Sequence, residues 1–327
     1  MNSRTWKIFI AALAIFAAAH CTTTDRTRRG YLRRSAAMLG APQRPVIVVP
    51  GYGLSRLFDP KTGRFVWGTA HAAVQRTFAD NLELDPGDRL VPRGFAGSRG
   101  PLNFAWQLRE ALRKFGGYTP EADLFTFAYD WRRSSMENAR ELDVLVQRVR
   151  NGGKVDIVTH SAGALVGLRY AEQHPESVEN LILVAPPQRG VADAFRLLVR
   201  GERLIRRTFS PAMAATWPSA YELLPEDGRF LIDENGQPID FDVWDPASWA
   251  RIGVTIDPEL LAAARRRPVS NVKTYVLAGD CVPTTKRVLR RKDGTYAFYL
   301  EELREPEKRL AGVMFEPGDG TVPVSSA

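Results

Sequence analysis

The chain has 327 residues, enough for one large α/β domain with an additional insertion. Hydrophobic residues make up 44% of it and charged residues 25%, a globular composition that excludes global disorder. The formal net charge of +8 comes without zinc-finger spacing, an RNA-binding signature or a basic zipper, so nucleic acid is not an expected partner.

The N-terminal segment has the pattern of an export signal. Arg4 and Lys7 precede an apolar run at 8–19 that is too short to span a bilayer as a mature helix. Residues 1–20 are therefore predicted to be a signal peptide, and the protein to be periplasmic or membrane-associated. Lipid anchoring at Cys21 is a second interpretation, although His20 stands where such a signal has a small residue. The polar, Arg-rich residues 21–43 are predicted to be an N-terminal tether.

The remainder, 44–327, is predicted to be one catalytic domain. Helical apolar spacing predicts helices at 102–116, 137–150 and 162–173. This alternation indicates a mostly parallel sheet with helices on both faces. Residues 189–268 break the alternation without a clear strand, so they are predicted to form a cap over the site. Short apolar runs bounded by turn residues predict buried strands at 45–49, 124–129, 155–159, 181–184 and 274–278.

Basic residues form three clusters, at 200–207, 265–267 and 290–292. A solvent-exposed face is the ordinary explanation for such clusters. Attraction to anionic lipid headgroups is the more specific hypothesis, and it fits the predicted membrane association.

A candidate nucleophile lies between a predicted strand and a predicted helix, in the sequence Thr159-His160-Ser161-Ala162-Gly163. A sharp strand-to-helix turn of this kind lifts a serine hydroxyl above the edge of the sheet in α/β-hydrolases. Thr159 departs from the usual Gly at its position. An ordinary serine at a helix N-terminus is the alternative, but the strand–turn–helix context favours Ser161 as a nucleophile.

The same turn predicts an oxyanion hole. The backbone N–H of Ala162, at the start of a helix, is expected to be one donor. The second donor should come from the loop after an early strand, which here reads Pro50-Gly51-Tyr52-Gly53. We expect the N–H of Gly53 to serve, with Tyr52 as the alternative; an ordinary tight turn would explain the glycines without catalysis.

Several further stretches follow in a fixed order along the chain. Together with the Ser161 turn they resemble the lecithin:cholesterol acyltransferase family, in particular its bacterial members. One departure is that Gly53 comes one position earlier than the corresponding glycine of the family. The stretches are Val49-Pro50-Gly51, Ser55-Arg56-Leu57, Asp59, Thr62-Gly63, Trp67-Gly68, Tyr129-Asp130-Trp131-Arg132, Ala185-Pro186-Pro187-Gln188-Arg189-Gly190, Pro218-Ser219, Tyr221-Glu222-Leu223-Leu224-Pro225 and Gly318-Asp319-Gly320-Thr321-Val322.

The resemblance implies an α/β-hydrolase fold and a lipid acyl hydrolase or O-acyltransferase that forms an acyl-enzyme on Ser161. It also implies a lipid ester substrate and makes Asp319 the catalytic acid, whereas a generic α/β-hydrolase would place its acid at Asp280, after the last predicted strand. No metal-ligand cluster or phosphate-binding glycine loop is found, so no cofactor or metal is expected. A carboxylesterase for small soluble esters is a weaker hypothesis.

A catalytic histidine is the missing part of this prediction. The expected order is Ser, acid, His, and no histidine follows Asp319. His20 lies in the signal region, His71 in an early loop and His174 at a helix end, and the side chain of His160 should point away from Ser161. The family carries its histidine on a further strand and loop. We therefore expect a truncated chain that lacks the last strand and helix, with a catalytically inactive lipid-binding relative as the alternative.

Overall fold

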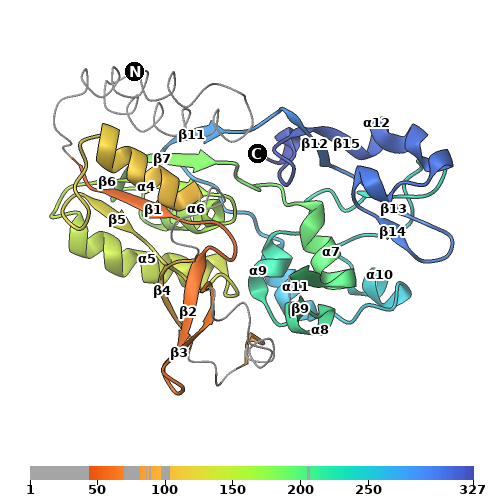
Figure 1. The fold of residues 1–327 in the computed structure, drawn as a ribbon, viewed down its shortest axis with the longest axis horizontal. Helices are drawn as coiled ribbons and strands as arrows, with labels where there is room; N and C mark the ends of the chain where they lie inside the picture. The colour runs from red at the N-terminus through yellow and green to blue at the C-terminus, as the bar shows by residue number, and fades with distance from the viewer. Residues whose placement is uncertain (1–43, 70–81, 86, 88–89, 97–103, 205–206) are drawn as a thin grey trace.

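The computed structural model describes residues 44–69, 82–85, 87, 90–96, 104–204 and 207–327. Predictions that concern residues 1–43, including the signal peptide, the tether and Cys21, lie outside this part and stay predictions. The centre of the fold is a five-stranded, all-parallel sheet in the order β11-β7-β6-β1-β5 (Figure 1). Its strands are β1 (Val46–Val49), β5 (Leu124–Thr126), β6 (Val155–His160), β7 (Val178–Val184) and β11 (Lys273–Leu277).

Helices cover both faces of this sheet. Ile47 and Val49 of β1 join the core beneath α5 (Ser135–Val149) and α6 (Gly163–Gln173). Val46 and Val48 point the other way and pack with Leu108 and Leu112 of α4 (Phe104–Phe115). Because successive side chains of a strand alternate between faces, a strand covered on both sides is apolar throughout. The predicted parallel sheet with helices on both faces is confirmed, and each predicted element lies within a few residues of its expected position.

A small antiparallel sheet that the sequence did not predict follows β1. Its order is β3-β2-β4, from β2 (Ser55–Asp59), β3 (Arg64–Trp67) and β4 (Val91–Phe95). In Figure 1 it projects below the main sheet from the end of β1. The loop between β1 and β2 is the Pro-Gly-Tyr-Gly segment, so this sheet holds one end of the predicted oxyanion loop.

The region at 189–268, predicted to be a cap, is largely helical, but the expectation that it has no strand was wrong. A short antiparallel hairpin follows its first helix, and β10 pairs outside the main sheet. These strands have only two or three residues, too few to show an alternating pattern. The elements are α7 (Ala192–Arg200), β8 (Glu202–Leu204), β9 (Arg207–Phe209), α8 (Pro211–Ala214), α9 (Pro218–Glu222), β10 (Leu231–Ile232), α10 (Pro246–Arg251) and α11 (Pro258–Ala264).

The chain after β11 forms a second region beside the cap (Figure 1). Two short sheets organise it: β12 pairs antiparallel with β15, and β13 lies between β10 and β14. The pairing with β10 joins this region to the cap. The elements are β12 (Val282–Thr285), β13 (Val288–Arg290), β14 (Tyr296–Ala297), η2 (Leu300–Glu302), η3 (Glu305–Leu310), α12 (Ala311–Met314), β15 (Phe315–Gly318) and η4 (Val324–Ser326).

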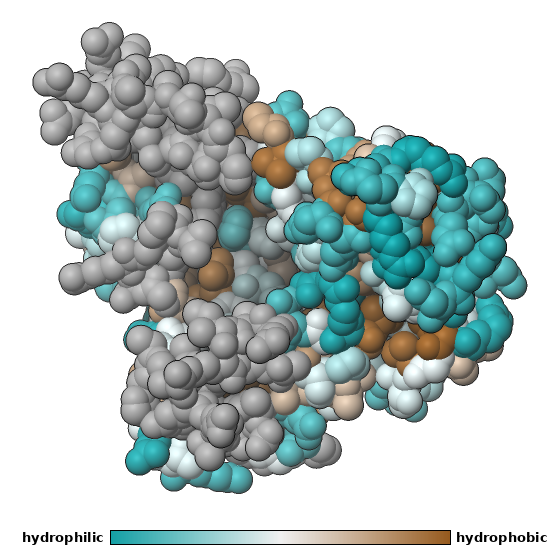
Figure 2. Space-filling view, turned by 45° about the vertical axis from the view of Figure 1, so that its right-hand side comes forward, coloured by the Kyte–Doolittle hydropathy of each residue, from teal (hydrophilic) through white to brown (hydrophobic). Residues whose placement is uncertain are grey.

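Figure 2 shows a largely hydrophilic face over this C-terminal region, with separate small hydrophobic areas. Two basic residues of the clusters seen in the sequence, Arg291 and Arg267, bind other parts of the chain and are buried or only partly exposed. Arg291 forms a two-point ion pair with Glu307, at 2.6 and 2.8 Å, in which both residues are buried. Arg267 donates to the carbonyl oxygens of Glu222 and Leu224. Within the described residues, no helix is long and apolar enough to cross a membrane.

Candidate active site

Ser161 lies in the sharp turn between β6 and α6. Its φ of 50° is in the left-handed region, which a residue with a Cβ rarely adopts. The turn is held from the neighbouring strand, because the backbone N–H of Ser161 donates to the carbonyl oxygen of Val184 at 2.9 Å. Such strain persists where the surrounding structure imposes it, and such residues cluster at functional sites.

Two glycines allow the chain to close around this serine. A methyl group added to Gly163 would lie 2.3 Å from the carbonyl oxygen of Pro50, and one added to Gly51 would lie 2.9 Å from Cβ of Ser161. Both distances are shorter than a real contact allows. The first turn of α6 and the Pro50–Gly53 loop can therefore approach the serine only because these positions lack side chains.

The Pro50–Gly53 loop is fixed by aromatic side chains. The hydroxyl of Tyr129 donates to the carbonyl oxygen of Pro50 at 3.0 Å, and Nε1 of Trp67 donates to that of Gly53 at 2.6 Å. Gly53 itself has a φ of +71°. With its carbonyl oxygens held in this way, the loop is kept in one conformation beside Ser161. This is the structural requirement for a backbone oxyanion donor.

Ser161 lines an apolar pocket of about 370 Å³, part of whose wall comes from the 189–268 region. Tyr52, Gly53 and Ala162 line it beside the serine, so the structure brings the predicted oxyanion residues together with the predicted nucleophile. The remaining described lining residues are Leu54, Trp67, Pro187, Val191, Asp193, Ala194, Arg196, Leu197, Glu202, Phe209, Ala220, Leu223, Thr321 and Val322.

The apolar residues of the 189–268 region divide into two groups. Leu197 and Phe209 line the pocket. Phe195 instead packs in a separate aromatic cluster, with ring centroids 5.1 Å from Phe230 and 5.6 Å from Phe241. The charged lining residues Asp193, Arg196 and Glu202 were not predicted, because their partners are set by the fold of the cap.

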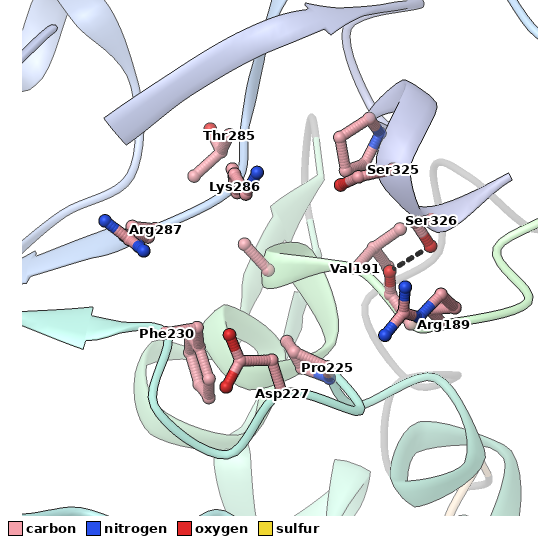
Figure 3. Close-up of a pocket in the computed structure, with 13 residues that line it drawn as sticks. Arg189, Val191, Pro225, Asp227, Phe230, Thr285, Lys286, Arg287, Ser325 and Ser326 are labelled. Carbon is pink, nitrogen blue, oxygen red and sulfur yellow. Dashed lines mark hydrogen bonds between the residues drawn. The ribbon is translucent and has the colours of Figure 1, made fainter. Parts of the chain in front are cut away.

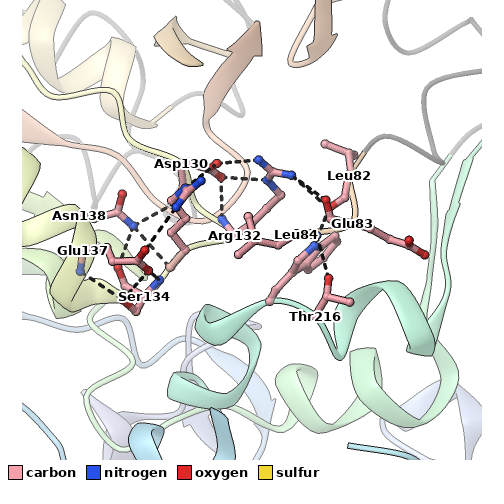
Figure 4. A network of polar contacts seen from close by, with 11 residues as sticks. Leu82, Glu83, Leu84, Asp130, Arg132, Ser134, Glu137, Asn138 and Thr216 are labelled. Carbon is pink, nitrogen blue, oxygen red and sulfur yellow. Dashed lines mark hydrogen bonds and ion pairs between the residues drawn. The ribbon is translucent and has the colours of Figure 1, made fainter. Parts of the chain in front are cut away.

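The Tyr129-Asp130-Trp131-Arg132 motif forms the wall behind the pocket. Trp131 is buried between the rings of Tyr52 and Trp67, whose centroids lie 4.9 and 5.3 Å away. Arg132 binds Asp130 with Nε and Nη2 at 3.0 and 2.7 Å (Figure 4). Its remaining nitrogen donates to the backbone of the 82–84 segment, which also meets Thr216 of the cap. The motif therefore joins sheet, cap and oxyanion loop.

Asp319 lies in the turn after β15, next to the pocket residues Thr321 and Val322. Its Oδ1 accepts hydrogen bonds of 2.8 Å from the N–H groups of both, which leaves Oδ2 without a partner among the described residues. Asp280, the alternative acid, is exposed and does not line the pocket; its contact is with the thiol of Cys281 at 3.4 Å. The geometry favours Asp319 over Asp280.

Two histidines, His160 and His174, lie in the described part of the chain. The imidazole of His160 is against Gly51, and burial lowers its pKa to about 4. His174 stacks on Tyr170 at the end of α6. His20 and His71 are outside the described residues. The hydrogen bonds of the Asp319 carboxylate come from the N–H groups of Thr321 and Val322, and the poor placement of the histidines as a base stays a prediction.

A second cavity, of about 250 Å³, shares Val191 with the first in its lining (Figure 3). Arg189, Lys286 and Arg287 reach it, but two of them are ion-paired: Arg189 with Glu226 and Lys286 with Glu316, each at 2.8 Å. Asp227 is also in its lining. Among the described residues, no group of His, Cys, Asp and Glu side chains has the arrangement of a metal site.

Comparison with known proteins gives two curated relatives. The uncharacterized protein YJR098C of Saccharomyces cerevisiae is 25% identical over 245 residues, which cover 71% of this chain and 37% of the relative. The lysosomal phospholipase A and acyltransferase of Canis lupus familiaris is 26% identical over 239 residues, which cover 64% of this chain and 54% of the relative. The chain thus spans between about a third and a half of the length of these relatives.

Among solved structures, a chain of the Tle4–Tli4 complex superposes with a TM-score of 0.52 at 16% identity, over 88% of this chain and 89% of that one. At this identity the similarity concerns the fold. A family model described as the alpha/beta hydrolase family matches residues 46–322, a range that contains the whole parallel sheet and the Ser161 turn. The chain belongs to the alpha/beta hydrolase family.

Proposed function

We propose that this protein is a lipid acyl hydrolase that uses Ser161 as its nucleophile, and that it can transfer the acyl group to an alcohol as well as to water. The observation that carries the proposal is the position of Ser161, strained at φ 50° and open to an apolar pocket next to a braced glycine loop. The similarity to a mammalian lysosomal phospholipase A and acyltransferase supports a lipid ester substrate.

In the proposed reaction, Oγ of Ser161 attacks the ester carbonyl carbon and its proton passes to a general base. The N–H groups of Ala162 and Gly53 receive the developing negative charge of the carbonyl oxygen. The alcohol leaves with a proton, and the acyl-enzyme on Ser161 is then opened by water or by an acceptor hydroxyl. Within the described residues the Asp319 carboxylate accepts from the N–H groups of Thr321 and Val322, and the proposal leaves the general base unassigned.

The lining of the pocket favours an acyl chain over a small polar ester. Trp67, Phe209 and Leu197 present apolar surface next to the serine. Its volume of about 370 Å³ lies near the lower end of the range for ligand pockets, roughly 300–1,000 Å³. A pocket with this lining and volume is expected to hold one medium-length acyl chain, while the rest of a larger lipid lies outside the pocket.

A second candidate function is lipid binding without catalysis. It is favoured by one observation: neither described histidine is hydrogen-bonded to the candidate acid Asp319. A fold does not by itself confer activity, and the same apolar pocket would hold a lipid in either case.

The test is hydrolysis of a medium-chain p-nitrophenyl ester and of a phospholipid by the chain without residues 1–20, with Ser161→Ala as the matched control. Loss of activity in Ser161→Ala, with unchanged folding, supports the hydrolase. Activity that survives in Ser161→Ala contradicts the assignment of the nucleophile. Binding of a lipid without turnover by either protein supports the second candidate. Hydrolysis of short soluble esters alone would instead favour a small-ester carboxylesterase.

A further inference from the structure

One wall of the apolar pocket is charged. Asp193 and Arg196 are one turn apart on α7 and so share a face of that helix, and Glu202 follows its end. Ala194 and Leu197, on the adjoining face of α7, continue the apolar wall. A hydrocarbon chain gains nothing from the charged wall, so it should lie along the apolar one. The polar part of a bound amphiphile is then left for the charged wall.

The hydrogen-bond donors of this wall are already used within the protein. Arg196 donates through Nε to Asp193 at 3.1 Å and through Nη2 to Glu202. Its Nη1 points to the carbonyl oxygen of Gly201 at 3.5 Å. The hydroxyl of Tyr299 also donates to Asp193, at 2.7 Å. An incoming phosphate or carboxylate would therefore have to displace an acidic partner of Arg196 to reach its guanidinium.

The polar atoms of this wall that make no hydrogen bond within the described residues are hydrogen-bond acceptors. All contacts of Asp193 are made by Oδ1 and those of Glu202 by Oε2, so Oδ2 of Asp193 and Oε1 of Glu202 have no partner among the described residues. Among the side chains that the structure describes on this wall, two carboxylates face one guanidinium, an excess of one negative charge. Arg200, the nearest further cation on α7, is paired with Glu302 and does not offset it.

We propose that Asp193, Arg196 and Glu202 form a polar subsite that accepts hydroxyl or ammonium groups of the ligand and disfavours anionic groups. Arg196 holds the two carboxylates in place, and their outer oxygens receive the ligand's donors. This subsite rests on the proposed function only in taking the pocket as the place where an amphiphile binds. The substrate class that follows is an ester whose polar part, next to the acyl chain, is neutral or cationic.

The experiment is isothermal titration calorimetry of the full chain with four amphiphiles of equal chain length, each below its micelle concentration: octylammonium, octyl glucoside, octyl sulfate and octyl phosphate. We expect the first two to bind about five- to tenfold more tightly than the two anions. Asp193→Asn and Glu202→Gln should each reduce this preference at least twofold, while Glu179→Gln keeps it. Glu179 is near the start of β7, at the opposite end of the parallel strands from Ser161, and its replacement makes the same change in net charge.

Equal binding of all four probes, or tighter binding of either anion, would overturn the proposal. So would an equal change in the preference for Glu179→Gln and the two pocket variants, since the effect would then come from overall charge. Thermal melting of each variant checks that it is folded. Asp193→Asn and Glu202→Gln test the charged wall independently, because each removes a different carboxylate. Charge-selective binding without Ser161-dependent hydrolysis would contradict the proposed function but support the subsite. Ser161-dependent hydrolysis without charge-selective binding would support the proposed function but contradict the subsite.

Discussion

Gly167 of α6 faces Thr159 of β6 so closely that a methyl group on the glycine would lie 2.6 Å from Cγ2 of the threonine. Thr159 occupies the position, two before Ser161, where the sequence departs from the usual glycine. Its side chain is fully buried, and its hydroxyl donates to the carbonyl oxygen of Ile182 at 3.3 Å. In the usual motif, a glycine at the Thr159 position lets the helix approach the strand. Here Gly167 of α6 makes room for the Thr159 side chain instead, so β6 and α6 still pack closely.

Gly167→Ala should therefore destabilise the protein. In an exposed helix the change would stabilise by about 1 kcal/mol. Here the added methyl would also lie 3.2 Å from Cδ1 of Leu181, and overpacking of a core costs about 1–3 kcal/mol. Urea denaturation measures the difference in the free energy of unfolding.

The double variant Thr159→Ser/Gly167→Ala is the control for this prediction. Serine keeps the hydroxyl but removes Cγ2, so the double variant should recover about 1 kcal/mol relative to the sum of the single changes. Strictly additive effects would mean that the two side chains do not compete for the same space.

Local sequence patterns were sufficient for the parallel sheet and for the sharp turn at Ser161. Each core strand is a short apolar run, and the strand–turn–helix order around Ser161 lies within one stretch of chain. The antiparallel strands β2, β3 and β4 were missed because each has only four or five residues, too few for a clear alternating pattern, and their pairing is decided by tertiary contacts.

The charged residues show a second limit of sequence reasoning. Arg291 was placed in a solvated basic cluster, but its partner Glu307 is sixteen positions away on a different element, η3. Likewise, the periodicity of α7 predicts which residues are covered. It does not distinguish Leu197, which lines the pocket, from Phe195, which packs in the aromatic core.

Arg132 should be among the residues most sensitive to substitution. It is fully buried, binds Asp130 at two points and holds the 82–84 backbone through its third nitrogen. Arg132→Met would leave the buried Asp130 carboxylate with only its longer ion pair to Arg133, at 3.5 Å, and we expect a loss of about 3 kcal/mol. The matched control is Arg304→Met, which removes an exposed ion pair with Asp293 and should cost no more than about 1 kcal/mol. Similar losses in chemical denaturation for the two variants would contradict the structural role given to Arg132.

Glu222 should give the stability a pH dependence. Burial raises the pKa of its carboxyl group, opposed by hydrogen bonds from the N–H and hydroxyl of Ser135 and by the charges of Arg169 and Arg267. A raised pKa means that the folded state holds this proton more tightly than the unfolded state. Its contribution is therefore greatest below the ordinary carboxyl pKa and is lost as the pH rises through the folded value.

Glu222→Gln removes this titration while keeping the size of the side chain. The free energy of unfolding of the wild type, relative to Glu222→Gln, should fall as the pH is raised from 4 towards neutrality, by no more than about 1.4 kcal/mol per pH unit. Parallel curves for the two proteins across this range would show that Glu222 has the same proton affinity folded and unfolded.

The choice between the two candidate acids has a direct test in Asp319→Asn and Asp280→Asn. Asparagine at 319 keeps one oxygen to accept from the N–H groups of Thr321 and Val322, so the turn is preserved and only the charge is lost. If Asp319 orients and stabilises the base, kcat for the medium-chain ester should fall by about 10³–10⁴-fold, as expected for a carboxylate in that role. Asp280 is exposed and outside the pocket, so its variant should keep kcat within about twofold. The opposite pattern would move the acid to Asp280 and leave Asp319 as a residue that only caps its own turn.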